Sequence, residues 1–467
     1  MRTLTEVRPT PEQLVLVSRV KPGVEVIRGA AGSGKTTTAI LRLRALIGTF
    51  VSRKRRQGRQ EPVRILVLTY NRTLRGYIKA LATQQVSDSP EIDLKISTFA
   101  RWARTNLGRP NMISTSQAKS KIGELGARLS LSSEFLAQEV DYLLGRFEHD
   151  KLAEYVGAVR VGRGTMPRVD RALREAILST VVEPYQKWKK DHKLLDWNDL
   201  AAILARNKTC EPYDIVIADE TQDFSANEIR AIINHVAELH SITFVLDAAQ
   251  RIYARGFTWQ EAGVSVGAHN THRLQQNYRN TVEIARFAAG IIEGLTFDDD
   301  GTMPDFSKCD RHGPKPIVIR GNFAAQTRYV INYITSNVDL TSQSVAVLHP
   351  LGGGWFDHAR TAFSKAKLPF VEITRESEWP EGKENIAFST IASAKGLEFD
   401  HVVMIGLNAE VLPHGSDESD DQLTRLRRLI AMGIGRASKS VIIGYKASDE
   451  PMLVKYLKPS TFDLVNL

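Results

Sequence analysis

The chain has 467 residues, of which 42% are hydrophobic and 25% charged, with a formal net charge of +9. This composition excludes a disordered or fibrous protein, and the length predicts two to four domains. The two cysteines, Cys210 and Cys309, exclude a disulfide framework and a zinc ribbon. No apolar run approaches the roughly 18 residues of a membrane span, and residues 1–20 lack the apolar core of a signal peptide. We therefore expect a reduced, cytoplasmic protein, and the positive charge modestly favours a polyanionic partner.

Along the chain, the first informative segment is a glycine-rich turn. Residues 29–36 read GAAGSGKT and fit G-x-x-x-x-G-K-[ST], between an apolar run and a helical pattern. In such a turn the backbone N–H groups and the helix N-terminus hold phosphates, while Lys35 reaches the β- and γ-phosphates and the Thr36 hydroxyl binds Mg²⁺. The nucleotide-contacting residues predicted here are Gly29, Ala30, Ala31, Gly32, Ser33, Gly34, Lys35, Thr36 and Thr37.

Two stretches flank this turn. Upstream, Gln13 is a candidate adenine reader because a carboxamide pairs with both the ring nitrogen and the exocyclic amine; the alternative is a surface residue. Downstream, we expect the helix to end near Gly48. The basic run at 52–61 is then more typical of a solvated loop than of a DNA contact.

Short runs rich in Val, Ile and Leu alternate with helical patterns, which predicts α/β domains with parallel sheets covered on both faces. The runs lie at 24–27, 64–68, 93–96, 214–218 and 242–246, and again at 316–320, 344–348, 385–389, 401–405 and 441–445. About a hundred residues inside the first series lack strand patterns, which predicts a mostly helical insertion. We therefore expect a first domain at 1–104 and 211–300, the insertion at 105–210 and a second domain at 301–467.

Residues for phosphate chemistry follow the apolar runs. Asp219 and Glu220 close the run at 213–218, where Asp219 would hold Mg²⁺ and Glu220 would orient and deprotonate the attacking water. Gln250 follows the next run and is a candidate sensor of the γ-phosphate. Arg279 and Arg436 are candidates for the positive charge that the transition state needs.

In this order, the motifs of the chain resemble those of the UvrD/Rep/PcrA-type DNA helicases of superfamily 1A. The matches are GAAGSGKT (29–36), TYNRTL (69–74), STF (97–99), DWNDL (196–200), DETQD (219–223), DAAQRIY (247–253), QNYRN (276–280), TIASAKGLEFD (390–400) and RRLIAMGIGRA (427–437). The resemblance implies two RecA-like motor domains with a helical insertion in the first. It also implies ATP-driven movement on DNA in the 3′ to 5′ direction.

The resemblance implies a role for each matching position. Gln13 resembles the adenine reader, Tyr278 the aromatic that stacks on adenine, and Glu398 a ribose or nucleotide contact. Arg279 and Arg436 resemble the two γ-phosphate arginines. The positions that resemble contacts to single-stranded DNA are Thr69, Tyr70, Asn71, Thr98, Phe99, Thr390 and Ser393. Two more aromatics, Phe257 and Trp259, are candidates either for stacking on DNA or for packing in the core.

The chain also departs from the family pattern. The stretch between Arg279 and Thr390 is too short for the large helical insertion, subdomain 2B, that regulates unwinding in the family. We therefore expect a reduced motor with one insertion. Smaller departures lie at Ala249, Ala392 and Leu426, where the family has an acid, a histidine and an acid, and at residues 253–259, where an aromatic and basic run is altered.

Two functions remain open on the sequence. The first is an ATP-dependent 3′–5′ helicase or translocase on single-stranded or tailed DNA, with ATP and Mg²⁺ as cofactors. The second is an ATP-gated, DNA-sensing regulatory subunit of a nuclease or antiphage defence complex, which rests on analogy. A small-molecule kinase would leave the second half of the chain unexplained. Motors that follow the backbone contact no base edges, so the motifs do not separate DNA from RNA.

Overall fold

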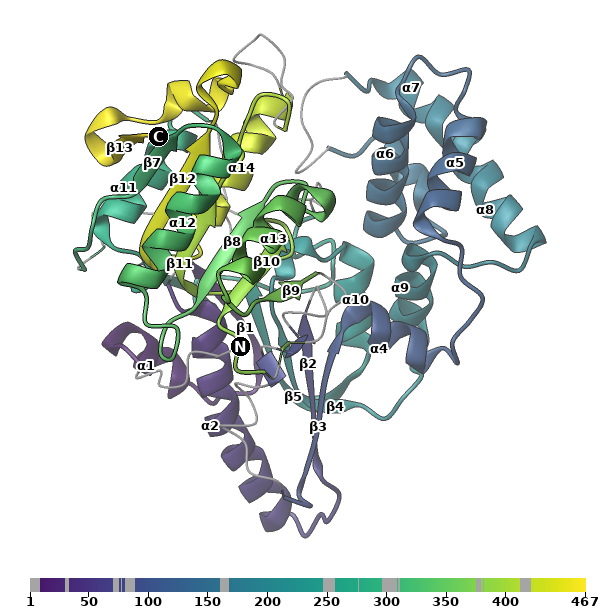
Figure 1. The fold of residues 1–467 in the computed structure, drawn as a ribbon. Coiled ribbons are helices and arrows are strands. Elements are labelled where there is room, and N and C mark those ends of the chain that lie inside the picture. Colours follow the sequence, from purple (N-terminus) through teal and green to yellow (C-terminus); the bar gives the residue numbers. More distant parts are fainter. Residues whose placement is uncertain are drawn as a thin grey trace.

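The fold contains two parallel β-sheets flanked by helices, and a group of helices stands beside the first sheet (Figure 1). The computed structural model describes residues 9–29, 33–69, 75–76, 78–79, 89–159, 168–246, 257–275, 277–295, 309, 311–374, 379–380, 382–411 and 421–467. This arrangement confirms the predicted α/β class, with two sheet domains and a mostly helical insertion in the first.

In the described residues, the first sheet has six strands in the order β3-β2-β4-β5-β1-β6. The strands are β1 Gly23–Gly29, β2 Val63–Thr69, β3 Ile92–Thr98, β4 Tyr213–Ala218, β5 Val236–Leu246 and β6 Thr271–Leu274. All pairs are parallel, so the carboxyl ends of the strands share one edge. Ligands bind at this edge in open α/β sheets. The edge therefore gathers the phosphate loop after β1 and the carboxylates after β4.

Helices cover both faces of this sheet, which explains why its central strands are apolar throughout. All six residues of β4 are buried. One face packs on α2 (Lys35–Arg56), and the other packs on α4 (Phe99–Asn106), α9 (Trp197–Arg206) and α10 (Ala226–Asn234). A short helix, α1 (Pro11–Val17), packs against α2 ahead of the sheet.

The second sheet is also parallel and has seven strands in the described residues, in the order β13-β7-β12-β11-β8-β10-β9. Its strands are β7 Ile317–Arg320, β8 Val345–His349, β9 Val371–Ile373, β10 Ile386–Thr390, β11 Phe399–Met404, β12 Ala437–Tyr445 and β13 Asp463–Asn466. Apolar residues of α12 (Phe323–Asn337) and α13 (Asp357–Lys365) cover one face. Those of α11 (Val282–Ile292) and α14 (Asp421–Ile434) cover the other.

The insertion is a helical body with its own apolar cluster. Its N-caps are Ser114, Ser132 and Asp170, whose side chains accept hydrogen bonds from the first turn of the helix that follows. Figure 1 shows these helices beside the first sheet, away from the second. The helices are α5 (Thr115–Leu125), α6 (Ser133–Arg146), α7 (Arg171–Ile177) and α8 (Glu183–Asp191).

Helix α2 is longer than the sequence indicated. It runs to Arg56, so the prediction that it ends near Gly48 is wrong, and the first part of the basic run is helical. Basic residues fit this last turn because they face the negative end of the helix dipole. Lys54 is buried there and its ammonium donates to the Asp214 carboxylate at 2.7 Å.

Helix α11 packs with the second sheet. It contacts α14 and β12, and the Arg427 guanidinium of α14 donates to the carbonyl of Ile291 at 2.7 Å. The chain has therefore joined the second domain before residue 282, whereas the sequence placed the boundary at residue 300. The apolar pattern of α11 does not reveal which sheet the helix covers.

The connection between β9 and β10 is short. The chain passes from β9 to β10 through residues 374–385, which leaves no room there for a folded subdomain. Within the described part of the chain, no helix is long and apolar enough to cross a membrane.

Candidate active site

The phosphate loop lies between β1 and α2, and two of its glycines are required by close packing. Gly34 has a φ of 74°, and a Cβ there would lie 2.3 Å from the Gln13 amide nitrogen. A Cβ on Gly29 would lie 2.9 Å from the carbonyl oxygen of Leu274. Lys35, Thr36 and Thr37 begin α2, so their backbone N–H groups stand at a helix N-terminus that favours phosphate. The predicted contacts Ala30, Ala31 and Gly32 lie outside the described residues.

The Gln13 side chain is engaged within the protein. Its Oε1 accepts from the Thr10 backbone N–H at 3.1 Å, and its Nε2 donates to the carbonyl of Ser33 at 3.1 Å. Gln13 therefore caps α1 and holds that helix against the phosphate loop. Reading adenine, the role that the resemblance implies, requires exchanging these two hydrogen bonds for hydrogen bonds to the base.

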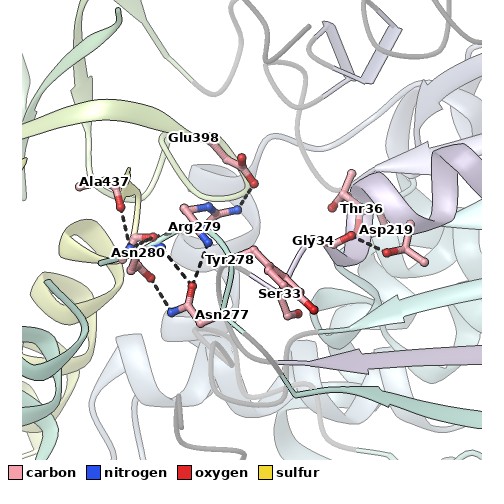
Figure 2. Close-up of polar contacts among 12 residues, drawn as sticks. Ser33, Gly34, Thr36, Asp219, Asn277, Tyr278, Arg279, Asn280, Glu398 and Ala437 are labelled. Carbon is pink, nitrogen blue, oxygen red and sulfur yellow. Dashed lines mark hydrogen bonds and ion pairs between the residues drawn. The ribbon is translucent and has the colours of Figure 1, made fainter. Parts of the chain in front are cut away.

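Asp219 lies beside the helix that would hold the nucleotide. The Thr36 hydroxyl donates to Asp219 Oδ2 at 2.9 Å, as Figure 2 shows. Burial, with the charge of Glu220 adding to it, raises the pKa of Asp219 to about 7. A hydroxyl and a carboxylate suit Mg²⁺, which takes few protein ligands and completes its shell with phosphate and water. In the described residues, no group of three His, Cys, Asp or Glu side chains could hold a metal.

Glu220 has the protonation state that a general base needs. Its burial disfavours the charged form, but the charges of Lys395, Arg436 and Lys35 outweigh burial and lower its pKa. The Gln222 amide also donates to Glu220 Oε2. Glu220 has a φ of 54°, a left-handed conformation that is strained for a residue other than glycine. Such strain is typical of functional positions, and an ionised carboxylate here can accept a proton from water.

A buried ion pair joins the two domains beside Glu220. The Lys395 ammonium, from the segment between β10 and β11, lies 2.5 Å from Asp223 Oδ2 and 3.7 Å from Glu220 Oε2. Asp223 has no exposed surface, so its charge needs this partner. The sequence motifs contained both residues, but we assigned neither a role. A lysine among small and apolar residues was the signal that could have shown it.

The second domain supplies the opposite side of the site. The Arg279 guanidinium pairs with the Glu398 carboxylate and donates to the carbonyl of Gly435 at 3.3 Å. The Asn280 amide donates to the carbonyl of Ala437 at 2.6 Å, which ties this segment to the chain around Arg436 (Figure 2). Asn280 was also missed by sequence reasoning, since asparagines beside an arginine carry no signal of their own.

The structure thus brings most predicted nucleotide residues to one place. Figure 2 shows Arg279 and Glu398 on one side and Thr36 with Asp219 on the other, and Tyr278 adjoins Arg279. Arg436 is buried and its charge acts on Glu220, so it lies close to the first domain's carboxylates. Gln250, the candidate phosphate sensor, lies outside the described residues.

The residues that resemble DNA contacts lie at the carboxyl ends of strands. Thr69 ends β2 and Thr98 ends β3, and the Thr98 hydroxyl accepts from the Arg101 backbone N–H as the cap of α4. In the second domain, the Thr390 hydroxyl donates to the Ser393 hydroxyl at 2.8 Å. Thr69 and Thr98 are therefore at the nucleotide edge of the first sheet, whereas Thr390 is at the carboxyl edge of the second sheet, opposite the amino ends of β11 and β12 that follow Glu398 and Arg436. Tyr70 and Asn71 lie outside the described residues.

The candidate stacking aromatics pack within the first domain. Phe99 is buried, with its ring centroid 5.5 Å from that of Trp102. Trp259 packs on Phe244 at 5.0 Å, and Phe257 packs edge-on against Trp259 at 6.0 Å. These contacts favour the core-packing alternative for Phe257 and Trp259, since their rings are already occupied by neighbours.

Comparison with known proteins places this site in a family. The UvrD/REP helicase N-terminal domain matches residues 10–267, and the UvrD-like helicase C-terminal domain matches residues 368–448. A "Probable DNA helicase II homolog" of Mycoplasma pneumoniae is 23% identical over 67% of this chain and 46% of its own length. A "Probable DNA helicase" of the same organism is 22% identical over 90% of this chain and 80% of its own length. The chain thus spans less than half of the first of these relatives.

Among solved structures, the C-terminal domain of a possible DNA helicase from Lactobacillus is 19% identical, with a TM-score of 0.31 over 40% of this chain and 98% of that one. The family assignment rests on the domain matches, which cover more than half of the chain and include the phosphate loop and both carboxylates. The chain belongs to the UvrD/Rep helicase family.

Proposed function

We propose that this protein hydrolyses ATP to move along single-stranded DNA in the 3′ to 5′ direction, and that it unwinds duplexes bearing a 3′ tail. One observation supports this proposal most strongly. Thr36 and Asp219 of the first domain lie opposite the pair of Arg279 with Glu398, and the charges of Lys395 and Arg436 from the second domain lower the pKa of Glu220. If a nucleotide binds between the two domains, its hydrolysis depends on the relative position of the domains. Hydrolysis can then drive a change in that position and so movement along DNA.

In this proposal each residue has a defined task. Lys35 and the backbone of the phosphate loop bind the β- and γ-phosphates, and Thr36 with Asp219 would hold Mg²⁺, which neutralises charge on the phosphates. Glu220 takes a proton from the attacking water. Arg279 and Arg436 stabilise the charge of the transition state, which requires the second domain to be in place.

The paired state of Arg279 indicates how this motor would be controlled. Its guanidinium is held by Glu398 and by the carbonyl of Gly435, both in the second domain. ATP would have to draw the arginine toward the γ-phosphate, or the whole segment would have to move with the domain. Either route ties hydrolysis to a rearrangement that bound DNA can favour.

The proposal is tested by ATP hydrolysis with and without single-stranded DNA. DNA should stimulate the rate strongly, and Lys35→Ala should lower the stimulated rate by about 10²–10³, as loss of a charge on the transition state does. The matched control is Lys21→Ala, an exposed lysine just before β1, which should leave the rate unchanged. A rate in the unaltered protein that does not respond to DNA would contradict the proposal.

The second candidate is a DNA-sensing regulatory subunit that uses the same site to control a partner such as a nuclease. The observation that favours it is the short connection at 374–385, where the family carries a regulatory subdomain. Unwinding of a 3′-tailed duplex by the purified protein separates the two. Processive unwinding without a partner supports the motor, whereas DNA-stimulated hydrolysis without unwinding supports the sensor.

A further inference from the structure

The connection between β9 and β10 reaches across to the first domain. These strands are parallel neighbours at one edge of the second sheet, so the chain must cross over between them, usually by a helix. Here the crossover is residues 374–385, and its Trp379 is buried with 8% of its surface exposed. Figure 1 shows that β9 lies on the side of the second sheet nearest the first. Part of the cover of Trp379 comes from the first domain.

Gly76 of the first domain provides that cover. A Cβ added to Gly76 would lie 2.6 Å from both the backbone nitrogen and the Cβ of Trp379. Real Cβ atoms do not approach so closely, so the backbones of the two domains meet here because Gly76 has no side chain. Ile78, two residues further along the chain, belongs with Trp379 and Ile373 to one apolar cluster. The contact is thus an apolar joint between the domains.

The two residues of this joint are each close along the chain to residues that resemble DNA contacts. On the first domain, Gly76 follows Thr69 by one short segment. On the second, Trp379 leads into β10, which ends at Thr390, and the chain continues to Ser393 and Lys395. A displacement of the second domain would therefore reach both DNA-contacting segments through Trp379.

We propose that Trp379 is a positioning residue that couples nucleotide binding between the two domains to the hold on single-stranded DNA. This inference rests on the proposed function. Closely packed groups switch between discrete arrangements and do not deform continuously. Because Trp379 packs directly on the backbone of Gly76, a movement of the second domain should also move the segment at Gly76. The short connection thereby ties the two domains directly, without an intervening subdomain.

The test measures how strongly the two ligands influence each other. Affinity for a fluorescent single-stranded oligonucleotide is measured with and without a non-hydrolysable ATP analogue and Mg²⁺. In the unaltered protein the two affinities should differ by about tenfold, a usual size for coupled sites. Trp379→Ala and Gly76→Ala act on opposite sides of the joint, and each should bring the ratio to within about twofold of one.

Matched variants separate coupling from damage to the fold. Gly48→Ala also adds a methyl to a helical glycine, but its Cβ meets no atom within 4 Å, so the ratio should stay as in the unaltered protein. Trp379→Phe keeps an aromatic ring and should retain most of the coupling. Thermal unfolding of each variant shows that it is folded.

The outcomes distinguish this inference from the proposed function. If DNA does not stimulate hydrolysis in the unaltered protein, the proposed function fails, and the inference fails with it. If DNA stimulates hydrolysis and the affinity ratio stays large in both Trp379→Ala and Gly76→Ala, the joint does not carry the coupling. The inference is then wrong while the proposed function stands.

Discussion

The charge of Glu220 depends on residues from both domains. Lys35 belongs to the first domain, whereas Lys395 and Arg436 come from the second, and all three lower the pKa of Glu220 against the effect of its burial. Moving the second domain away would remove two of these positive charges. Because a base must be ionised to accept a proton, the proposed role of Glu220 as the base requires that the two domains be together.

This dependence gives a prediction for the pH profile of hydrolysis. Lys395→Ala removes the largest charge that holds the pKa of Glu220 down, so that pKa should rise. The acid limb of the DNA-stimulated rate should then move to higher pH, since the base is protonated over a wider range. The variant also removes the ammonium that pairs with the buried Asp223 carboxylate, which should lower the free energy of unfolding by about 3–5 kcal/mol.

Two further variants make this result interpretable. Lys395→Arg keeps the positive charge and should keep the acid limb near its original position. Lys439→Ala removes a half-exposed lysine that pairs with Asp400 on the second domain, and should change neither the limb nor the stability by much. If the acid limb of the pH profile does not move in Lys395→Ala, then ionisation of Glu220 does not determine that limb.

At the scale of elements, the turn after β8 depends on an uncharged histidine. His349 Nδ1 accepts hydrogen bonds from the backbone N–H groups of Leu351 at 3.2 Å and Gly352 at 3.1 Å. A nitrogen that accepts two hydrogen bonds carries no proton. Burial accordingly lowers the pKa of His349 to about 4. This turn lies against Thr390, because a Cβ on Gly352 would be 2.6 Å from the Thr390 methyl.

The sign of the resulting pH dependence follows from the lowered pKa. In the unfolded chain His349 takes up a proton below about pH 6.5, and in the folded chain only near pH 4. The contribution of neutral His349 to the free energy of unfolding is therefore complete above pH 6.5 and is lost as the pH falls toward 4. Between pH 7 and 5.5 the loss amounts to about 1 kcal/mol. Denaturant unfolding at the two pH values should show a smaller decline in His349→Asn, which keeps an acceptor but does not titrate.

The control for this prediction is His312→Asn, which alters a largely exposed histidine. It should leave the decline unchanged. His401 is a second buried histidine with a pKa lowered to about 4, so part of the decline should remain in His349→Asn. Equal declines in the unaltered protein and in His349→Asn would contradict the account.

Elements differed in how far the sequence could predict them. The central strands of both sheets were found because burial on both faces leaves continuous apolar runs, as in β4. Strands β6, β9 and β13 were missed because they are short edge or near-edge strands with mixed side chains. The extension of α2 past Gly48 was missed because glycine lowers helix propensity, while the packing of Phe50 and Lys54 decides the outcome.

At the site, the motifs predicted which residues lie at the phosphate loop, but not which side chains pair with one another. The phosphate loop and Asp219 follow from residue type and spacing. The joint between Trp379 and Gly76 and the pair of Lys395 with Asp223 join residues from distant parts of the chain. Nothing in either local sequence specifies such partners, so only the fold could show them.

In the whole molecule, we propose that the two sheet domains share one nucleotide site and move together along a DNA strand. Two contacts and one electrostatic interaction between the domains bear on this proposal. Lys395 reaches Asp223 at the carboxylates, Arg436 acts on Glu220, and Trp379 packs on Gly76. They tie the first domain's carboxylates and the segment at Gly76 to the second domain, so a movement of the second domain reaches both.

Displacement of streptavidin from biotinylated single-stranded oligonucleotides tests this claim most directly. A motor that moves 3′ to 5′ should displace streptavidin from the 5′ end when ATP and Mg²⁺ are supplied, and displacement from the 3′ end should stay at the rate of spontaneous release. Lys35→Ala should show neither. Absence of ATP-dependent displacement from both ends would contradict movement on the strand, and faster displacement from the 3′ end would contradict the direction.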